Sequence, residues 1–178
     1  EILRLPRPRD EARVLLFDGH SHIYRAYYAI RDLSSPDGRP INALFGFWKA
    51  FLRAFRDHPS AYAAVVLDAG GRTFRHDLYA EYKATRKPMP DDLASQMPLI
   101  VELLNYLGVP VMSETGVEAD DVLATLAARA AAEGLSCLIA TSDKDMAQIV
   151  NERVSLLRPA GRGVAAAEQV LASEGVHR

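Results

Sequence analysis

Short apolar runs with the character of buried strands alternate along this chain with segments of helical periodicity. The strand-like runs lie at residues 13–18, 61–68, 109–113, 135–142 and 153–159. Two parallel strands need a crossover connection, so strands separated by helices are typical of βαβ units. The alternation therefore predicts an α/β fold with a doubly wound, mostly parallel sheet of about five strands and helices on both faces.

Helical periodicity fills most of the chain between and after these runs. It is clearest in INALFGFWKAFLRAF, where apolar residues recur with a period near 3.6. The expected helices are residues 20–30, 41–55, 93–109, 118–134, 144–150 and 165–175. The 178 residues suffice for one domain with a sizeable core, which we place at residues 13–178 after a tail at residues 1–12.

Composition limits the class of protein. Hydrophobic residues make up 49% of the chain and charged residues 25%, as in an ordinary globular domain. No apolar run approaches the roughly 18 residues that a membrane helix needs, so no membrane partner is expected. The single cysteine, Cys137, lies in an apolar run and gives neither a disulfide framework nor a thiolate zinc site. We expect a cytoplasmic protein.

Acidic residues stand where the strand-like runs end and where one helix begins. They are Asp18, Asp68, Glu118, Asp120, Asp121, Asp143 and Asp145. The carboxyl ends of parallel strands share one edge of a sheet, so these side chains should converge there. Crowded carboxylates repel one another unless cations neutralise them. Oxygen donors without His or Cys fit Mg²⁺ or Mn²⁺ and argue against zinc.

Each acid also has a structural explanation. Asp18 and Asp68 are suited to begin turns, and Thr115 with Glu118 matches a capping box. Acids in a first helical turn are favoured by the helix dipole. Three acids in four residues exceed what capping requires, which favours a metal cluster. Asp143 and Asp145 share a side only if their segment is extended, and the spacing leaves that open.

A basic and aromatic connection follows the second strand-like run. Residues 72–87 interleave arginines and lysines with Phe74, Tyr79 and Tyr82, and prolines follow. Cations pair with phosphates and aromatic rings stack on unpaired bases, which predicts nucleic-acid contact. The alternative is an amphipathic helix whose apolar side packs on the core. We expect a mobile connection that is poorly ordered without DNA. Arg25, a turn after Asp18, either reaches the acidic cluster or pairs with one of its acids.

Several stretches together resemble one known family. They are LLFDGHSHIYRAYYAI, INALFGF, VVLDAGGRTFRHDLYAEYKATRKPMPDDL, GVEADDVLATLA and TSDKDMAQIV. In order and content they resemble the 5′-nuclease domain (5′→3′ exonuclease and flap endonuclease) at the N-terminus of bacterial DNA polymerase I, and its stand-alone relatives. The resemblance covers about residues 13–175. It implies a resolvase-like or PIN-like nuclease core with a helical arch at about residues 72–92.

The resemblance also implies a function and residue roles. It implies a divalent-metal nuclease that hydrolyses phosphodiesters near 5′ ends, flaps and junctions of DNA in replication and repair, with two Mg²⁺ or Mn²⁺ ions in the complete protein. All seven acids named above would be metal ligands, direct or through water. Lys83 and Arg25 would lie near the scissile phosphate. The expected DNA-binding residues are Arg25, Gly46, Phe74, Arg75, Tyr82, Lys83 and Arg86. The resemblance implies two partners: DNA with a 5′ single-stranded arm or flap, and a covalently attached polymerase domain.

The C-terminal end departs from the family pattern. The family continues with two more aspartates that complete a second metal site, and then with a helix–three-turn–helix element that grips duplex DNA. This chain ends at Arg178, before both. We therefore expect a full first ion site and an incomplete second one at Asp143 and Asp145. Two rival hypotheses remain: a DNA-binding module without catalysis, and a different Mg²⁺-dependent α/β phosphotransfer domain.

Overall fold

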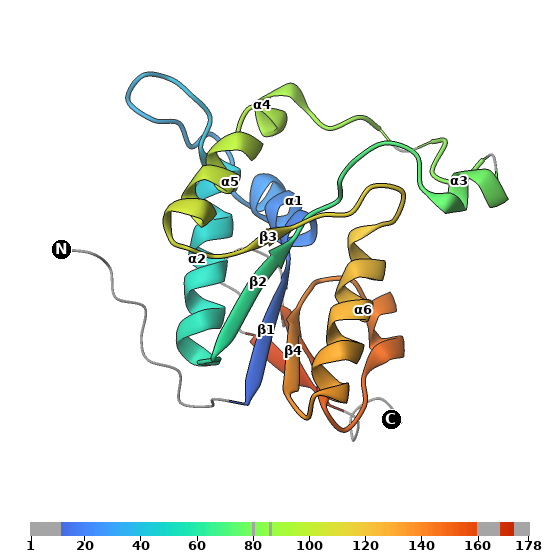
Figure 1. Cartoon of the computed structure of the whole chain (residues 1–178). Coiled ribbons are helices and arrows are strands. Elements are labelled where there is room, and N and C mark those ends of the chain that lie inside the picture. The colour runs from blue at the N-terminus through green and yellow to red at the C-terminus, as the bar shows by residue number, and fades with distance from the viewer. Residues whose placement is uncertain (1–11, 80, 86, 160–167, 173–178) are drawn as a thin grey trace.

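A six-stranded sheet forms the centre of the computed structural model, which describes residues 12–79, 81–85, 87–159 and 168–172 (Figure 1). The strands are β1 (Arg13–Asp18), β2 (Tyr62–Val66), β3 (Val111–Met112), β4 (Ser136–Ala140), β5 (Val154–Pro159) and β6 (Glu168–Leu171). Their spatial order is β3-β2-β1-β4-β5-β6. The strands β1 to β5 are parallel, and β6 runs antiparallel to β5. The predicted mostly parallel sheet is therefore confirmed.

Helices cover both faces of this sheet (Figure 1). They are α1 (Gly19–Ala29), α2 (Asn42–Asp57), α3 (Phe74–Leu78), α4 (Asp91–Ala94), α5 (Met97–Tyr106), α6 (Ala119–Ala132) and the 3₁₀ helix η1 (Asp145–Ile149). In Figure 1, α2 and α5 lie on one side of the sheet and α6 on the other. Among the described residues no helix is both long and apolar enough to cross a membrane.

Alternation along β1 builds a core on each face of the sheet. Leu15 and Phe17 point into a cluster formed with α1, α2 and α5, and Leu16 points into the opposite cluster with α6 and η1. Phe17 meets Phe47 and Phe51 of α2 edge-on, with ring centroids 5.6 and 5.5 Å apart. The second half of β1 is thus buried on both faces of the sheet, up to Asp18 at its carboxyl end.

The polypeptide beyond β5 corrects one prediction. A final helix was expected at residues 165–175, but residues 168–171 form strand β6, and residues 160–167 and 173–178 lie outside the described part. The β6 strand pairs with the edge strand β5 from Leu156 to Pro159. An unpaired edge exposes a row of backbone donors and acceptors, so this pairing outweighs the local helical preference. The sheet consequently has six strands instead of about five.

The helix expected at residues 93–109 is divided in two. Helix α4 ends at Ala94 and α5 begins at Met97, with Gln96 between them. Gln96 is fully buried, and its side-chain Oε1 accepts hydrogen bonds from the backbone N–H groups of Ala43 and Leu44, at 2.9 and 3.1 Å. It thereby caps the first turn of α2, whose own N-cap residue makes no side-chain bond. Pro98, which has no N–H to continue a helix, lies at the start of α5 and accounts for the break locally.

Candidate functional site

A pocket of about 410 Å³ opens at the carboxyl edge of the sheet, beside the N-termini of α1 and α6. The neighbouring strands β1 and β4 connect in opposite directions, to β2 and to β5, so the topological switch point of the sheet lies between them, where ligands bind in open α/β folds. Five carboxylates line the pocket: Asp18, Asp68, Glu118, Asp120 and Asp143. Arg25 and Lys83 also line it. The structure thus brings together five of the seven predicted acids and both predicted catalytic cations.

Asp18 is held at the base of this pocket as the N-cap of α1. Its Oδ1 accepts the backbone N–H of Ser21 at 3.0 Å, and its Oδ2 accepts the hydroxyl of Thr141 at 2.7 Å. The residue is 4% exposed. Burial raises the pKa of Asp18, against the lowering effect of those two hydrogen bonds. The two bonds fix the carboxylate between β1 and β4.

Asp68 joins β2 to the start of α6. Its Oδ1 accepts the backbone N–H of Ala119 at 2.7 Å, and that N–H is among the orphan donors of the helix. The backbone N–H of Asp68 donates to Nδ1 of His20 at 3.0 Å, so the proton of that imidazole is on Nε2. Asp68 therefore ties the carboxyl end of β2 to two helix N-termini.

Glu118 begins α6 in a capping box. Its side chain accepts the backbone N–H of Asp121, while the Asp121 carboxylate accepts the backbone N–H of Glu118 at 3.0 Å. The structural explanation from the sequence thus holds for Glu118 and Asp121, although the predicted partner of Glu118 was Thr115. Glu118 lines the pocket as well, so capping and pocket formation coexist in one side chain.

Asp121 lies outside the residues that line the pocket. Its two oxygens accept a bidentate pair of hydrogen bonds from Arg75, at 2.6 and 2.7 Å. These bonds hold the pKa of Asp121 below its ordinary value. Asp121 was expected to face the same ion as Glu118. In the structure its charge is instead neutralised by Arg75, 46 residues away in sequence.

Asp120 is the acid most strongly affected by the cluster. Burial, followed by the charges of Asp18, Asp143, Asp68 and Glu118, raises the pKa of Asp120 to about 6. Both burial and the neighbouring carboxylates thus disfavour the charged form of Asp120. The pocket therefore favours positive charge.

The loop after β4 separates the last two acids. Asp143 lines the pocket, whereas Asp145 is exposed at the start of η1. The Oδ1 of Asp143 accepts the backbone N–H of Asp145 at 2.8 Å in an Asx turn. The segment is thus not extended at Asp143, and the side chains of Asp143 and Asp145 diverge.

Residues of the connection after β2 contact an acid of this pocket, Glu118. The ammonium of Lys83 donates to Oε1 of Glu118 at 2.8 Å, and the hydroxyl of Tyr82 donates to Oε2 at 3.1 Å. Lys83 has a positive φ of 54°, which is unusual for a residue with a side chain. The connection contains the short helix α3 and a turn at residues 81–85 where a long helical arch was expected, and Arg86 lies outside the described residues.

Divalent-cation binding fits this pocket chemically, but the ligands are not pre-arranged. Within the described residues no three His, Cys, Asp or Glu side chains stand close enough together to hold an ion. The oxygens of Asp18, Asp68 and Glu118 are engaged by the donors described above. The donors are all oxygen, and the raised pKa of Asp120 marks uncompensated negative charge. An ion would therefore have to draw these side chains toward itself.

Gly46 corrects a prediction about DNA contact. It is buried in α2 against α1, where an added Cβ would lie 2.7 Å from the Cβ of Ala26 and 3.0 Å from Cδ1 of Ile30. The absence of a side chain serves the approach of the two helices. Phe74, another predicted DNA contact, is 45% exposed, with the Arg75 guanidinium 4.6 Å from its ring centre.

Aromatic residues along α1 complete the pocket and were not singled out from the sequence. His20, Tyr24 and Tyr28 line it, with centroids 6.4 Å apart at each step. Their spacing of four residues on one helix was the available signal. Thr141, which fixes Asp18, had no signal, because its role depends on the pairing of β1 with β4.

A comparison with protein families matches residues 13–177 to the family described as 5′-3′ exonuclease, N-terminal resolvase-like domain. Among curated proteins, DNA polymerase I of Thermus thermophilus is 43% identical over 157 residues, which are 88% of this chain and 19% of that protein. The 5′-3′ exonuclease of Aquifex aeolicus is 37% identical over 161 residues, which are 90% of this chain and 56% of that protein. The chain thus spans about a fifth of the polymerases that it matches.

Solved structures support the fold. The T5 D15 protein crystallised with metal ions has a TM-score of 0.64 at 16% identity, covering 90% of this chain and 58% of that one. The T5 D15 flap endonuclease in a complex with DNA and metal ions gives the same TM-score at 15% identity, covering 90% and 57%. At this level of identity the similarity concerns the fold, and it confirms the predicted PIN-like, resolvase-like architecture.

Proposed function

Since the chain belongs to the family of 5′-3′ exonuclease N-terminal, resolvase-like domains, we propose that it is the catalytic core of a divalent-metal-dependent, structure-specific 5′ nuclease. Its substrate would be DNA with a 5′ end or flap, during replication and repair in the bacterial cytoplasm, and a polymerase domain would be attached to it. The observation that carries the proposal is the convergence of five carboxylates, Arg25 and Lys83 on one pocket at the switch point of the sheet.

The five pocket acids would hold the ions, as Mg²⁺ or Mn²⁺. Bound there, divalent ions lower the pKa of a water molecule and offset the charge of a phosphodiester. Asp18 and Asp68 are placed by the helix N-termini that they cap, so their positions are set by the fold. Asp120 would gain most from the ions, because its charge is the least compensated.

The cations and aromatic residues would orient the DNA. Arg25 and Lys83 lie at the same pocket as the acids, where they can pair with phosphate oxygens. Tyr24 and Tyr28 present ring surface to the pocket, on which unpaired bases can stack. This arrangement suits a strand that enters the pocket with its bases unpaired. A phosphotransfer domain that acts on a small substrate would have no use for it.

Cleavage of a 5′-flap substrate by the natural full-length protein tests the proposal. We expect cleavage that depends on Mg²⁺ or Mn²⁺ and falls at least about 100-fold in Asp68→Asn, which can still accept the Ala119 N–H. Asp68→Ala should lose cleavage as well. Asp57→Asn, an exposed acid on α2, is the matched control and should cleave normally.

Two outcomes contradict the proposal. Equal cleavage by Asp68→Asn and the unaltered protein would remove the metal role of the pocket. Flap binding without metal-dependent cleavage would instead select the DNA-binding module without catalysis.

A further inference from the structure

Arg75 is the residue that joins helix α3 most firmly to the rest of the molecule. Its Nη1 and Nη2 donate to the two oxygens of Asp121 at 2.6 and 2.7 Å, which is the planar fork that an arginine and a carboxylate can form and a lysine cannot. One face of the guanidinium packs on the ring of Phe74, 4.6 Å from its centre. Two of its five N–H donors and one face of the guanidinium are therefore already engaged within the protein.

The carboxylate that receives this fork also holds Glu118. The Oδ2 of Asp121 accepts both from Arg75 Nη1 and from the backbone N–H of Glu118, the latter at 3.0 Å. Arg75 Nη1 is itself 3.7 Å from Oε2 of Glu118. Three residues thus form one continuous clamp from α3, through the first turn of α6, to an acid of the pocket.

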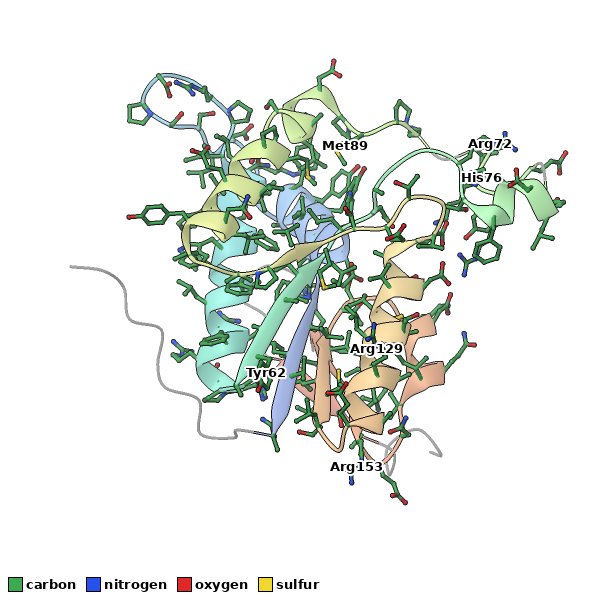
Figure 2. The ribbon with its side chains drawn as sticks, viewed as in Figure 1. Tyr62, Arg72, His76, Met89, Arg129 and Arg153 are labelled. Atoms are coloured by element: carbon green, nitrogen blue, oxygen red, sulfur yellow. The ribbon has the colours of Figure 1, made fainter. Side chains whose placement is uncertain are left out.

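Among the described residues, few other contacts hold α3 in place. None of its five residues is buried, and Leu78 is 80% exposed. One backbone bond, from Phe74 N–H to Gly116 O at 3.0 Å, supports the clamp. Figure 1 shows α3 apart from the sheet, and Figure 2 shows Arg72 and His76 in this outlying region. The polar contacts of Arg75 therefore hold α3 in place, whereas hydrophobic packing holds the other helices.

We propose that Arg75 is a positioning residue, which docks α3 on α6 through Asp121 and so holds Tyr82 and Lys83 over Glu118, and that it does not contact the nucleic acid. Tyr82 and Lys83 follow the end of α3 by a few residues, and both donate to Glu118. The proposal replaces the two roles expected from the sequence, DNA contact for Arg75 and metal ligation for Asp121. It rests on the proposed function only where DNA binding is measured.

Limited proteolysis of the natural full-length protein, without metal or DNA, tests the docking. Arg75→Lys keeps the charge and the trypsin site but loses the fork. We expect cleavage after Lys83 to become about tenfold faster, the size of effect expected when one partly exposed bidentate ion pair is lost. Arg72→Lys is the matched control, since the Arg72 side chain is 73% exposed and pairs only with Asp77 of α3 among the ion pairs of the described residues, and it should leave the rate unchanged. An unchanged rate in Arg75→Lys, or equal rates in the two variants, overturns the proposal.

The salt dependence of flap-DNA binding, measured in EDTA, separates positioning from contact. Removing one phosphate contact lowers the slope of log K against log salt by about 0.7 to 0.9. Because Asp121 already neutralises Arg75, we expect Arg75→Met to change the slope by less than about 0.3. A fall of about 0.7 or more overturns the proposal. If the protein bound no DNA, the proposed function would fail, while proteolysis would still decide the docking.

Thermal unfolding provides the last readout. Because α3 buries no side chain, Arg75→Lys should keep the unfolding midpoint within about 2 °C of the unaltered protein. A larger fall would make Arg75 a general stability residue and would also overturn the proposal.

Discussion

Replacing Asp120 with asparagine removes one charge from the pocket and keeps the size of the side chain. Burial and four neighbouring carboxylates raise the pKa of Asp120 from 3.8 to about 6. A carboxyl group with a raised folded-state pKa destabilises the folded protein above its unfolded pKa, because the unfolded chain releases the proton more easily. We therefore expect Asp120→Asn to stabilise the metal-free protein at neutral pH.

The magnitude follows from the pKa shift. About two pKa units, at 1.36 kcal/mol each, set an upper limit of about 3 kcal/mol. Solvent screening of a side chain that is only partly buried reduces this to about 1–2 kcal/mol. The gain is absent below pH 3.8, grows between pH 3.8 and about 6, and is constant above that range.

Urea unfolding in EDTA at pH 7.5 and pH 4 measures this gain as the difference between Asp120→Asn and the unaltered protein. Glu102→Gln, an exposed acid on α5, is the matched control and should show no pH-dependent gain. Addition of Mg²⁺ should reverse the order, because the unaltered protein binds the ion more tightly. Equal or lower stability of Asp120→Asn at pH 7.5 would refute the argument that the cluster stores electrostatic repulsion.

Three further predictions concern neighbouring features. Gly46→Ala should destabilise the fold by about 1–2 kcal/mol in urea unfolding despite better helix propensity, because its Cβ would lie 2.7 Å from that of Ala26; a gain in stability would contradict the packing role. Burial lowers the pKa of His22 from 6.5 to about 4. The folded protein is therefore unaffected by His22 protonation above pH 6.5, and up to about 3 kcal/mol of the free energy of unfolding is lost as pH falls toward 4. That acid-side loss should be absent in His22→Gln, and an identical pH profile for both proteins would disprove it. Lys83→Met should bind Mg²⁺ several-fold more tightly without DNA by calorimetry, because the ammonium that competes for Glu118 is gone; weaker binding would show that Lys83 does not compete.

Sequence reasoning succeeded where local pattern decides structure. Asp18 and Asp68 end short apolar runs that are typical of buried parallel strands, so their meeting at one edge of the sheet could be predicted. It failed where partners are distant. The clamp on Asp121 comes from a residue 46 positions away, and β6 forms because β5 presents an edge. Gly46 was expected at the DNA from the family resemblance, because the sequence does not show that its neighbours belong to another helix.

The way the pocket acids are anchored explains how they can gather at one edge of the sheet. Asp18, Asp68 and Glu118 each accept a backbone N–H from the first turn of a helix, where the helix dipole supplies partial positive charge. The fold thus compensates three charges before any cation arrives, and Lys83 adds a full positive charge at Glu118. Asp120 has no such partner among these contacts, and burial, followed by repulsion from the other pocket acids, raises its pKa to about 6. The same acids therefore stabilise α1 and α6 and would also hold the proposed ions, so alanine substitutions would mix loss of a cap with loss of a ligand. Asparagine at Asp18 or Asp68 retains an oxygen acceptor for the helix, and is the substitution that separates the two roles.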